Sequence, residues 1–169
     1  MISKEENKRY FQVFKDTIDQ NMIKYINKTV VIINGKEYQY EELNDEADRI
    51  ASYLSRNLYD RFPLGMNTDN PICIGVCLPH GFRLLASILA ICRLGYTYVP
   101  LDPMTPNGRL MFIFNDCKMT AVLIEQDEWN NDWDGMIINL SKIDGIKLSQ
   151  PIYAVSYTHL RAHETVLDL

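Results

Sequence analysis

The spacing of hydrophobic residues in the first third of the chain predicts a helix, a β-hairpin and a second helix. Residues 5–21 carry apolar side chains at helical intervals, which is typical of an amphipathic helix. Residues 29–33 and 36–39 flank Asn34-Gly35, a pair that supplies the two positive-φ residues of a type I′ hairpin turn. The next apolar positions share one helical face, which we expect to form core: Leu43, Ala47, Ile50, Ala51, Leu54 and Leu58.

From residue 71 onward the pattern alternates between strands and helices. The apolar run 72–78 predicts a strand covered on both faces. Residues 81–94 predict a buried helix, which Gly95 closes in the left-handed conformation. We expect further strands at 96–101, 121–125 and 136–140, and a helix over 106–116 with Thr105 as N-cap and Pro106 as first helical residue. This order predicts an α/β fold with a mostly parallel sheet, flanking helices and one N-terminal hairpin.

Composition excludes several classes of partner. A chain of 169 residues suggests one domain or part of a larger one. Its net charge of −5 argues against a nucleic-acid partner. The longest apolar run, 84–92, is far shorter than the roughly 20 residues of a membrane span, and the polar start MISKEENKRY lacks a signal peptide's apolar region. We therefore expect a cytoplasmic protein with no nucleic-acid or membrane partner.

Residues 90–110, AICRLGYTYVPLDPMTPNGRL, are the most informative stretch of the chain. They resemble the second core motif of the adenylation domains of peptide synthetases, L-K-A-G-x-A-Y-V-P-L-D. Gly95 and residues 98–102 match this motif, and Arg93 conservatively replaces its lysine. Three positions depart from it: Cys92, Leu94 and Thr97.

A second stretch, residues 38–43 (YQYEEL), resembles the first core motif of the same family, L-T-Y-x-E-L, at the usual distance upstream. In the family the threonine can cap the following helix, and the glutamate three residues on closes a capping box. This chain has Gln39 in place of the threonine and keeps Glu42. The cap is therefore expected to be weakened.

The resemblance implies the N-terminal part of the large subdomain of an AMP-forming adenylating enzyme. Such enzymes join a carboxylate to the α-phosphate of ATP and release pyrophosphate. For the full-length parent the resemblance implies ATP and Mg²⁺, a small-molecule carboxylate that we expect to be an amino acid, and an acyl acceptor left open between a carrier protein, CoA and none. Two alternatives are an acyl-CoA or aryl-CoA ligase, and a non-catalytic α/β binding domain. The V-P-L-D-P run followed by P-x-x-R argues against the first alternative, because that form is commoner in amino-acid activators. The second alternative gives no reason for a chain to carry both motifs at this separation.

Residues 155–165, VSYTHLRAHET, match the translation of a transposase-based sequencing adapter. We therefore expect residues 1–154 to be an N-terminal fragment of an AMP-binding adenylation domain and residues 155–169 to be adapter-derived. The family's glycine-rich phosphate loop would follow a strand at 151–154, so the chain as given is expected to be inactive. His159 and His163 fall in this tail and do not indicate a metal site.

No catalytic, cofactor-binding or metal-binding residue is predicted in this chain. Asp102 is interpreted as a turn or cap residue rather than a metal ligand, and His80 as a structural residue rather than a base. Arg83 stands where many relatives carry an acidic residue, which predicts an altered ion pair. The remaining candidates are interpreted as packing aromatics, Tyr96, Tyr98, Trp129 and Trp133, and as buried reduced thiols, Cys73, Cys77, Cys92 and Cys117.

Overall fold

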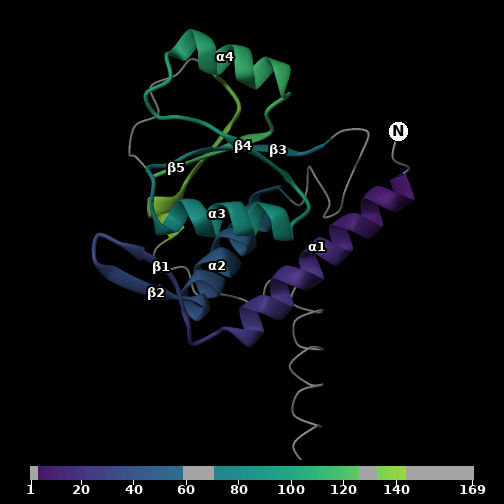
Figure 1. Ribbon diagram of the computed structural model, residues 1–169. Coiled ribbons are helices and arrows are strands. Elements are labelled where there is room, and N and C mark those ends of the chain that lie inside the picture. Colours follow the sequence, from purple (N-terminus) through teal and green to yellow (C-terminus); the bar gives the residue numbers. More distant parts are fainter. Residues whose placement is uncertain (1–3, 59–70, 126–132, 144–169) are drawn as a thin grey trace, which may run out of the picture.

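The predicted hairpin is present at the N-terminal end of the molecule. The computed structural model describes residues 4–58, 71–125 and 133–143 (Figure 1). Strands β1 (Thr29–Ile33) and β2 (Lys36–Gln39) pair antiparallel. Asn34 has a φ of 52° and Gly35 a φ of 78°, as a type I′ turn requires. The short loop therefore brings the two strands together directly.

The second sheet contains four parallel strands and confirms the predicted α/β fold. These strands are β3 (Cys73–Cys77), β4 (Thr97–Pro100), β5 (Ala121–Ile124) and β6 (Met136–Asn139). Their order is β4-β3-β5-β6, so β3 lies inside the sheet although it comes first in the chain. The chain thus passes from β3 to β4 on one side of it and then to β5 on the other side.

Helices cover both faces of this sheet. Helices α2 (Tyr40–Leu58) and α3 (Phe82–Arg93) lie on one face, and α4 (Asn107–Asp116) lies on the opposite face (Figure 1). A short 3-10 helix, η1 (Leu140–Ile143), follows β6. Both faces of the sheet are therefore buried, as its continuous apolar strands require.

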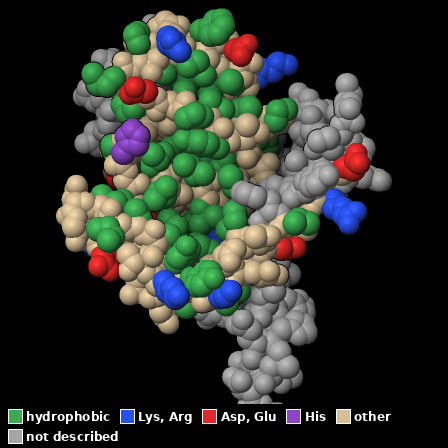
Figure 2. Space-filling view, viewed as in Figure 1, with side chains coloured by type: hydrophobic (Ala, Val, Ile, Leu, Met, Phe, Trp, Pro, Cys, Tyr) green, Lys and Arg blue, Asp and Glu red, His purple; other side chains and the backbone are tan. Residues whose placement is uncertain are grey.

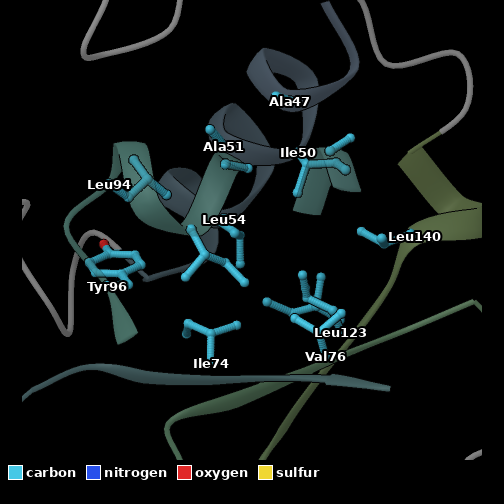
Figure 3. Packing of buried hydrophobic residues seen from close by; sticks show 14 of the residues in the cluster. Ala47, Ile50, Ala51, Leu54, Ile74, Val76, Leu94, Tyr96, Leu123 and Leu140 are labelled. Atoms are coloured by element: carbon cyan, nitrogen blue, oxygen red, sulfur yellow. The ribbon is translucent and has the colours of Figure 1, made fainter. Parts of the chain in front are cut away.

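The larger hydrophobic core lies between the sheet and helices α2 and α3 (Figure 3). The six apolar residues of α2 that the helical spacing assigned to the core are all buried. Leu54 and Ile50 are fully buried, which is worth about 1.5–3 kcal/mol for each side chain. Alternation along β3 directs Ile74 and Val76 into this core. The opposite face of β3 contributes Cys73 to a second core beneath α4.

The connection from α3 to β4 has the geometry expected of its glycine. Gly95 has a φ of 73°, its amide donates to the carbonyl of Cys92 at 3.0 Å, and the amide of Tyr96 donates to that of Ile91 at 3.1 Å. This pair of bonds is the Schellman motif, which satisfies carbonyls left over at the end of a helix. The motif turns the chain sharply from α3 into β4.

The predicted start of α4 is wrong by one residue. Pro106 has a ψ of 143°, which is not helical, and it is the N-cap in place of Thr105. Its carbonyl accepts the amides of Arg109 at 2.9 Å and Leu110 at 3.1 Å. Thr105 is held in the preceding turn, because its own amide donates to the carbonyl of Asp102 at 2.9 Å. The helix therefore begins at Asn107.

The described contacts of the first helix, α1 (Lys4–Lys24), with the larger core come from its second half. Ile18 packs against the larger core and Met22 is buried, whereas Val13 is 57% exposed. The expected apolar face is thus covered at its C-terminal end, and Figure 1 shows the helix extending away from the body. None of the described helices is long and apolar enough to cross a membrane.

Candidate functional site at the carboxyl edge of the sheet

The parallel strands place all their carboxyl ends at one edge of the sheet. Strand β3 leads through α3 to β4, and β4 leads back through α4 to β5 on the other side of β3. In open α/β sheets, ligands bind outside the carboxyl ends of neighbouring strands where the connections diverge. Here those neighbours are β3 and β5. We name the residues that directly follow the four strands the carboxyl edge.

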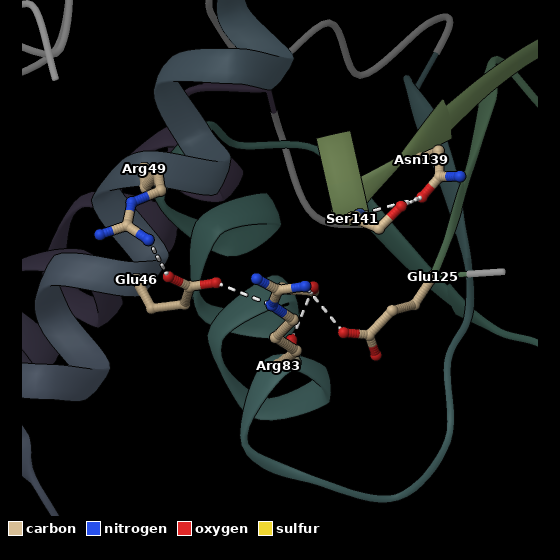
Figure 4. A network of polar contacts seen from close by, with 7 residues as sticks. Glu46, Arg49, Arg83, Glu125, Asn139 and Ser141 are labelled. Atoms are coloured by element: carbon tan, nitrogen blue, oxygen red, sulfur yellow. Dashed lines mark hydrogen bonds and ion pairs between the residues drawn. The ribbon is translucent and has the colours of Figure 1, made fainter. Parts of the chain in front are cut away.

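A charged network ties three elements together at the carboxyl edge (Figure 4). Arg83, in the first turn of α3, donates from Nε to Oε1 of Glu46 on α2 at 3.1 Å. Its Nη1 donates to Oε1 of Glu125, the residue after β5, at 2.8 Å. Glu46 also pairs with Arg49 at 3.0 Å. The sequence predicted an altered ion pair at Arg83 but did not identify its carboxylate partners.

Partial burial makes the Glu46–Arg83 pair of this network stronger than an ordinary surface ion pair, whereas Glu125 is 33% exposed. The side chain of Glu46 is 10% exposed and that of Arg83 is 21% exposed. Charged hydrogen bonds that are partly shielded from water contribute more than the 0–1 kcal/mol of an exposed pair. The network therefore holds α2, the start of α3 and the end of β5 in fixed positions relative to one another.

Other polar residues of the carboxyl edge have structural roles. The carboxylate of Asp102 accepts the amide of Met104 at 2.8 Å, which confirms the interpretation of Asp102 as a turn residue. Asn139 Oδ1 accepts the backbone amide of Ser141 at 2.9 Å and its hydroxyl at 2.8 Å (Figure 4). His80 is exposed at the junction of β3 and α3. The side chains of Asp102 and Asn139 therefore hold the loops around the edge, whereas a structural role for His80 stays a prediction.

A second charged cluster, at the other end of α3, was not predicted from the sequence. Arg93 is buried and donates from Nη1 to Asp48 at 2.8 Å and from Nη2 to Asn44 at 2.8 Å. Asp19 of α1 lies 3.3 Å from Nη2 and forms an ion pair without hydrogen-bond geometry. Burial raises the pKa of Asp19, and the charge of Arg93 only partly opposes this effect. An arginine at the end of an otherwise apolar helix was the signal available in the sequence.

The candidate aromatic residues pack into the two cores. Tyr96 is buried and Tyr98 is half-buried, and burial raises the pKa of both hydroxyls. Trp133 packs on Phe114 with ring centroids 4.8 Å apart. The packing interpretation is thus confirmed for these three residues, whereas Trp129 lies outside the described residues.

The four cysteines are free, and burial raises the pKa of three of them, Cys73, Cys77 and Cys92. Cys73 and Cys77 are buried as predicted, whereas Cys92 and Cys117 are half-buried. Within the part of the chain that the structure describes, no three His, Cys, Asp or Glu side chains are grouped to hold a metal ion.

Comparison with known proteins identifies the family. The sequence model of the family described as "AMP-binding enzyme" matches residues 18–162. The chain belongs to the AMP-binding enzyme family. Tyrocidine synthase 3 of Brevibacillus parabrevis is 32% identical to this chain over 98 residues, which are 58% of this chain and 1% of that protein.

Two solved structures share the fold of this chain. One is an artificially fused adenylation–PCP di-domain of a nonribosomal peptide synthetase from Klebsiella oxytoca, with a TM-score of 0.69, 12% identity and coverage of 81% of this chain and 26% of that chain. The other is the O-succinylbenzoate coenzyme A synthetase of Bacillus subtilis, with a TM-score of 0.65, 12% identity and coverage of 78% and 33%.

These findings confirm the predicted family and fold. The chain is a fragment that resembles the adenylation domains of nonribosomal peptide synthetases, and it has the fold of the N-terminal subdomain of adenylation enzymes. It spans a small part of the synthase and a quarter to a third of the solved enzymes. The division at residues 154 and 155 lies outside the described residues and stays a prediction.

Proposed function

We propose that the parent of this AMP-binding chain is an ATP-dependent enzyme that activates an amino acid as an aminoacyl-adenylate. In this reaction a carboxylate oxygen attacks the α-phosphorus of ATP, the bond to pyrophosphate breaks and a mixed anhydride forms. The observation that carries the proposal is the stretch 90–110, whose matching positions form the end of α3, β4 and the turn at Asp102. The likeness to peptide synthetases supports amino acids as the substrate class.

Within the parent, the described residues would form a scaffold rather than the catalytic groups. The network of Arg83, Glu46 and Glu125 fixes the carboxyl edge, where substrates of such folds bind. ATP with its Mg²⁺ is a proposed substrate, but the described residues do not include a metal-binding group for it. We therefore assign no residue of this chain to the phosphates or the metal.

We further propose a carrier protein as the acyl acceptor and the cytoplasm as the location. The solved di-domain in which adenylation and PCP units are fused supports the first proposal. The absence of a basic net charge agrees with a small-molecule substrate in preference to nucleic acid.

We propose that the chain as given does not catalyse adenylation. Losing one electrostatic donor alone costs about a hundredfold or more in rate, and neither the glycine-rich loop nor a catalytic lysine is found in residues 1–153. Strand β4 is the first strand in the order of the described sheet, and Figure 2 shows apolar side chains on the surface of the chain. Met104 and Phe112 are among the exposed apolar residues. It should therefore self-associate in solution.

The test is amino-acid-dependent exchange of labelled pyrophosphate into ATP. The assay is run on this chain and on the parent recovered by sequencing the source locus. We expect exchange by the parent with one or a few amino acids and none by the chain. Exchange by the chain itself would overturn its proposed inactivity.

A second candidate is an acyl-CoA or aryl-CoA ligase, which the fold shared with the O-succinylbenzoate coenzyme A synthetase favours. Exchange by the parent with aryl or fatty acids and not with amino acids would establish this candidate. A parent without any adenylating activity and without a glycine-rich loop would instead indicate a non-catalytic binding domain.

A further inference from the structure

The buried charged cluster at the end of α3 also holds the first helix of the chain. The guanidinium group of Arg93 contacts two other helices, because Asn44 and Asp48 belong to α2 and Asp19 belongs to α1. The side chains of Arg93 and Asp19 are only 5% and 7% exposed, so little water reaches their ion pair. Arg93 therefore forms a charged link between α1 and the body of the fold.

Asp19 is the most weakly held member of this cluster. Its Oδ1 lies 3.3 Å from Nη2 of Arg93 and has no hydrogen-bond partner, whereas Asp48 and Asn44 each accept a hydrogen bond from Arg93 at 2.8 Å. Two carboxylates thus share one guanidinium group, which leaves an excess of negative charge when both are ionised. A buried charge with incomplete hydrogen bonding costs free energy. The geometry therefore favours a protonated Asp19 while α1 is docked.

The chain directly after α1 is anchored independently of the cluster. The amide of Glu41 donates to the carbonyl of Ile26 at 3.0 Å, and the amide of Tyr40 donates to that of Lys28 at 3.0 Å. These bonds tie the connection after α1 to the start of α2. Helix α1 can therefore swing about the residues between Lys24 and Ile26 while the hairpin and α2 keep their positions.

We propose that Asp19 and Arg93 form a pH-dependent latch, which releases α1 from α2 and α3 when Asp19 loses its proton to water. Burial raises the pKa of Asp19; the charges of Arg93 and Lys15 lower this pKa, and that of Asp16 raises it. Docking is therefore strongest below the unfolded pKa of 3.8 and weakens as the pH rises through the higher pKa of the docked state. The latch goes beyond the proposed adenylation activity and does not require it.

Apolar contacts oppose the release of α1. Met22 is 4% exposed and Ile18 packs against the larger core, so both side chains leave an apolar environment when the helix swings out. Release also uncovers the guanidinium group of Arg93, which keeps its bonds to α2. Ionisation of Asp19 therefore shifts an equilibrium between docked and released α1 in an otherwise folded chain.

Hydrogen–deuterium exchange of the full chain tests the latch. The exchange is measured by mass spectrometry at low protein concentration and at a series of pH values from 3.8 upward, and protection is calculated against unstructured peptides at each pH. We expect the second half of α1 to be less protected than α2 and to lose up to about tenfold of its protection per pH unit, until it exchanges freely while α2 stays protected. Equal protection of the two helices at every pH would overturn the proposal, because α1 would then open only with the whole fold. Protection of α1 that does not change with pH would also overturn it.

Two variants of α1 identify the group that titrates. Asp19→Asn removes the ionisable group at nearly the same size and should keep α1 protected to the same degree across the series. Asp16→Asn is the matched control, because it makes the same change at an exposed position of the same helix, and it should retain the wild-type loss of protection. A wild-type loss in Asp19→Asn would assign the effect to another group and overturn the latch. An α1 that is unprotected at every pH in Asp19→Asn would also overturn it, since docking would then require the charge of Asp19.

Discussion

The helix cap at Gln39 offers a quantitative test of how this chain departs from its family. Gln39 ends β2, and its backbone amide donates to Oε2 of Glu42 at 2.8 Å. This bond is one half of a capping box, and it places Gln39 at the N-cap with Glu42 at the third helical position. The other half requires a short hydroxyl side chain, which glutamine lacks. Gln39→Thr should therefore complete the box.

The expected gain is about 1 kcal/mol, since N-cap hydroxyls contribute roughly 0.5–2 kcal/mol. For a domain of this size, that gain corresponds to about 2–4 °C in melting temperature. The matched control is Gln39→Val, because valine has the shape and strand preference of threonine without its hydroxyl. Melting is followed by circular dichroism at low protein concentration, so that self-association does not hide the shift. Equal melting temperatures for the Thr and Val variants would refute the assigned capping geometry.

Three further changes test packing and electrostatics. Leu54→Ala should lower the unfolding free energy by about 2–5 kcal/mol, measured by urea denaturation, because the fully buried side chain leaves a cavity. Gly75→Ala should lower the unfolding free energy by about 1–3 kcal/mol in the same assay, because the new Cβ would lie 2.7 Å from Leu101 Cδ1 in a packed core. Unchanged stability would mean that Leu101 moves freely. The pKa of Asp19 is raised in the folded state, so its contribution is fully present below its unfolded pKa of 3.8 and is lost as the pH rises through the folded value. Asp19→Asn should thus gain stability relative to wild type as the pH rises above 3.8, and an unchanged difference between the two proteins across that rise would contradict the assignment.

Local chemistry explains which parts of the fold could be predicted from the sequence. The hairpin depends on the positive φ angles of Asn34 and Gly35, and the end of α3 depends on Gly95, so each is determined by a few adjacent residues. The buried face of α2 follows from a regular spacing that a single helix can satisfy in only one way. The sequence therefore predicted these elements correctly, together with the elements that precede and follow them in the chain.

The missed features depend on contacts between distant residues. Arg93 is buried because its guanidinium group donates hydrogen bonds to Asp48 and Asn44 on another helix. No local sequence pattern specifies this contact between the two helices. The partners of Arg83 likewise come from α2 and from the end of β5. At the start of α4, Thr105 is an excellent N-cap residue by type, but the turn from Asp102 places it one residue too early. Tertiary contacts thus determine these ion-pair partners and the start of α4, which local residue preferences do not specify.

The strand order has a consequence for how the chain folds during synthesis. Helix α2 leaves the ribosome early, yet the core that covers its apolar face also contains residues of α3, β3, β5 and η1, and the last of these residues in the chain is Ile143. At about 5–20 residues per second, the 85 residues from Leu58 to Ile143 take roughly 4–17 s to synthesise. During that interval the nascent helix exposes the surface that later becomes the centre of the core. We therefore expect the nascent chain to depend on ribosome-associated chaperones, and a synonymous change that slows translation before residue 143 should lower the soluble yield.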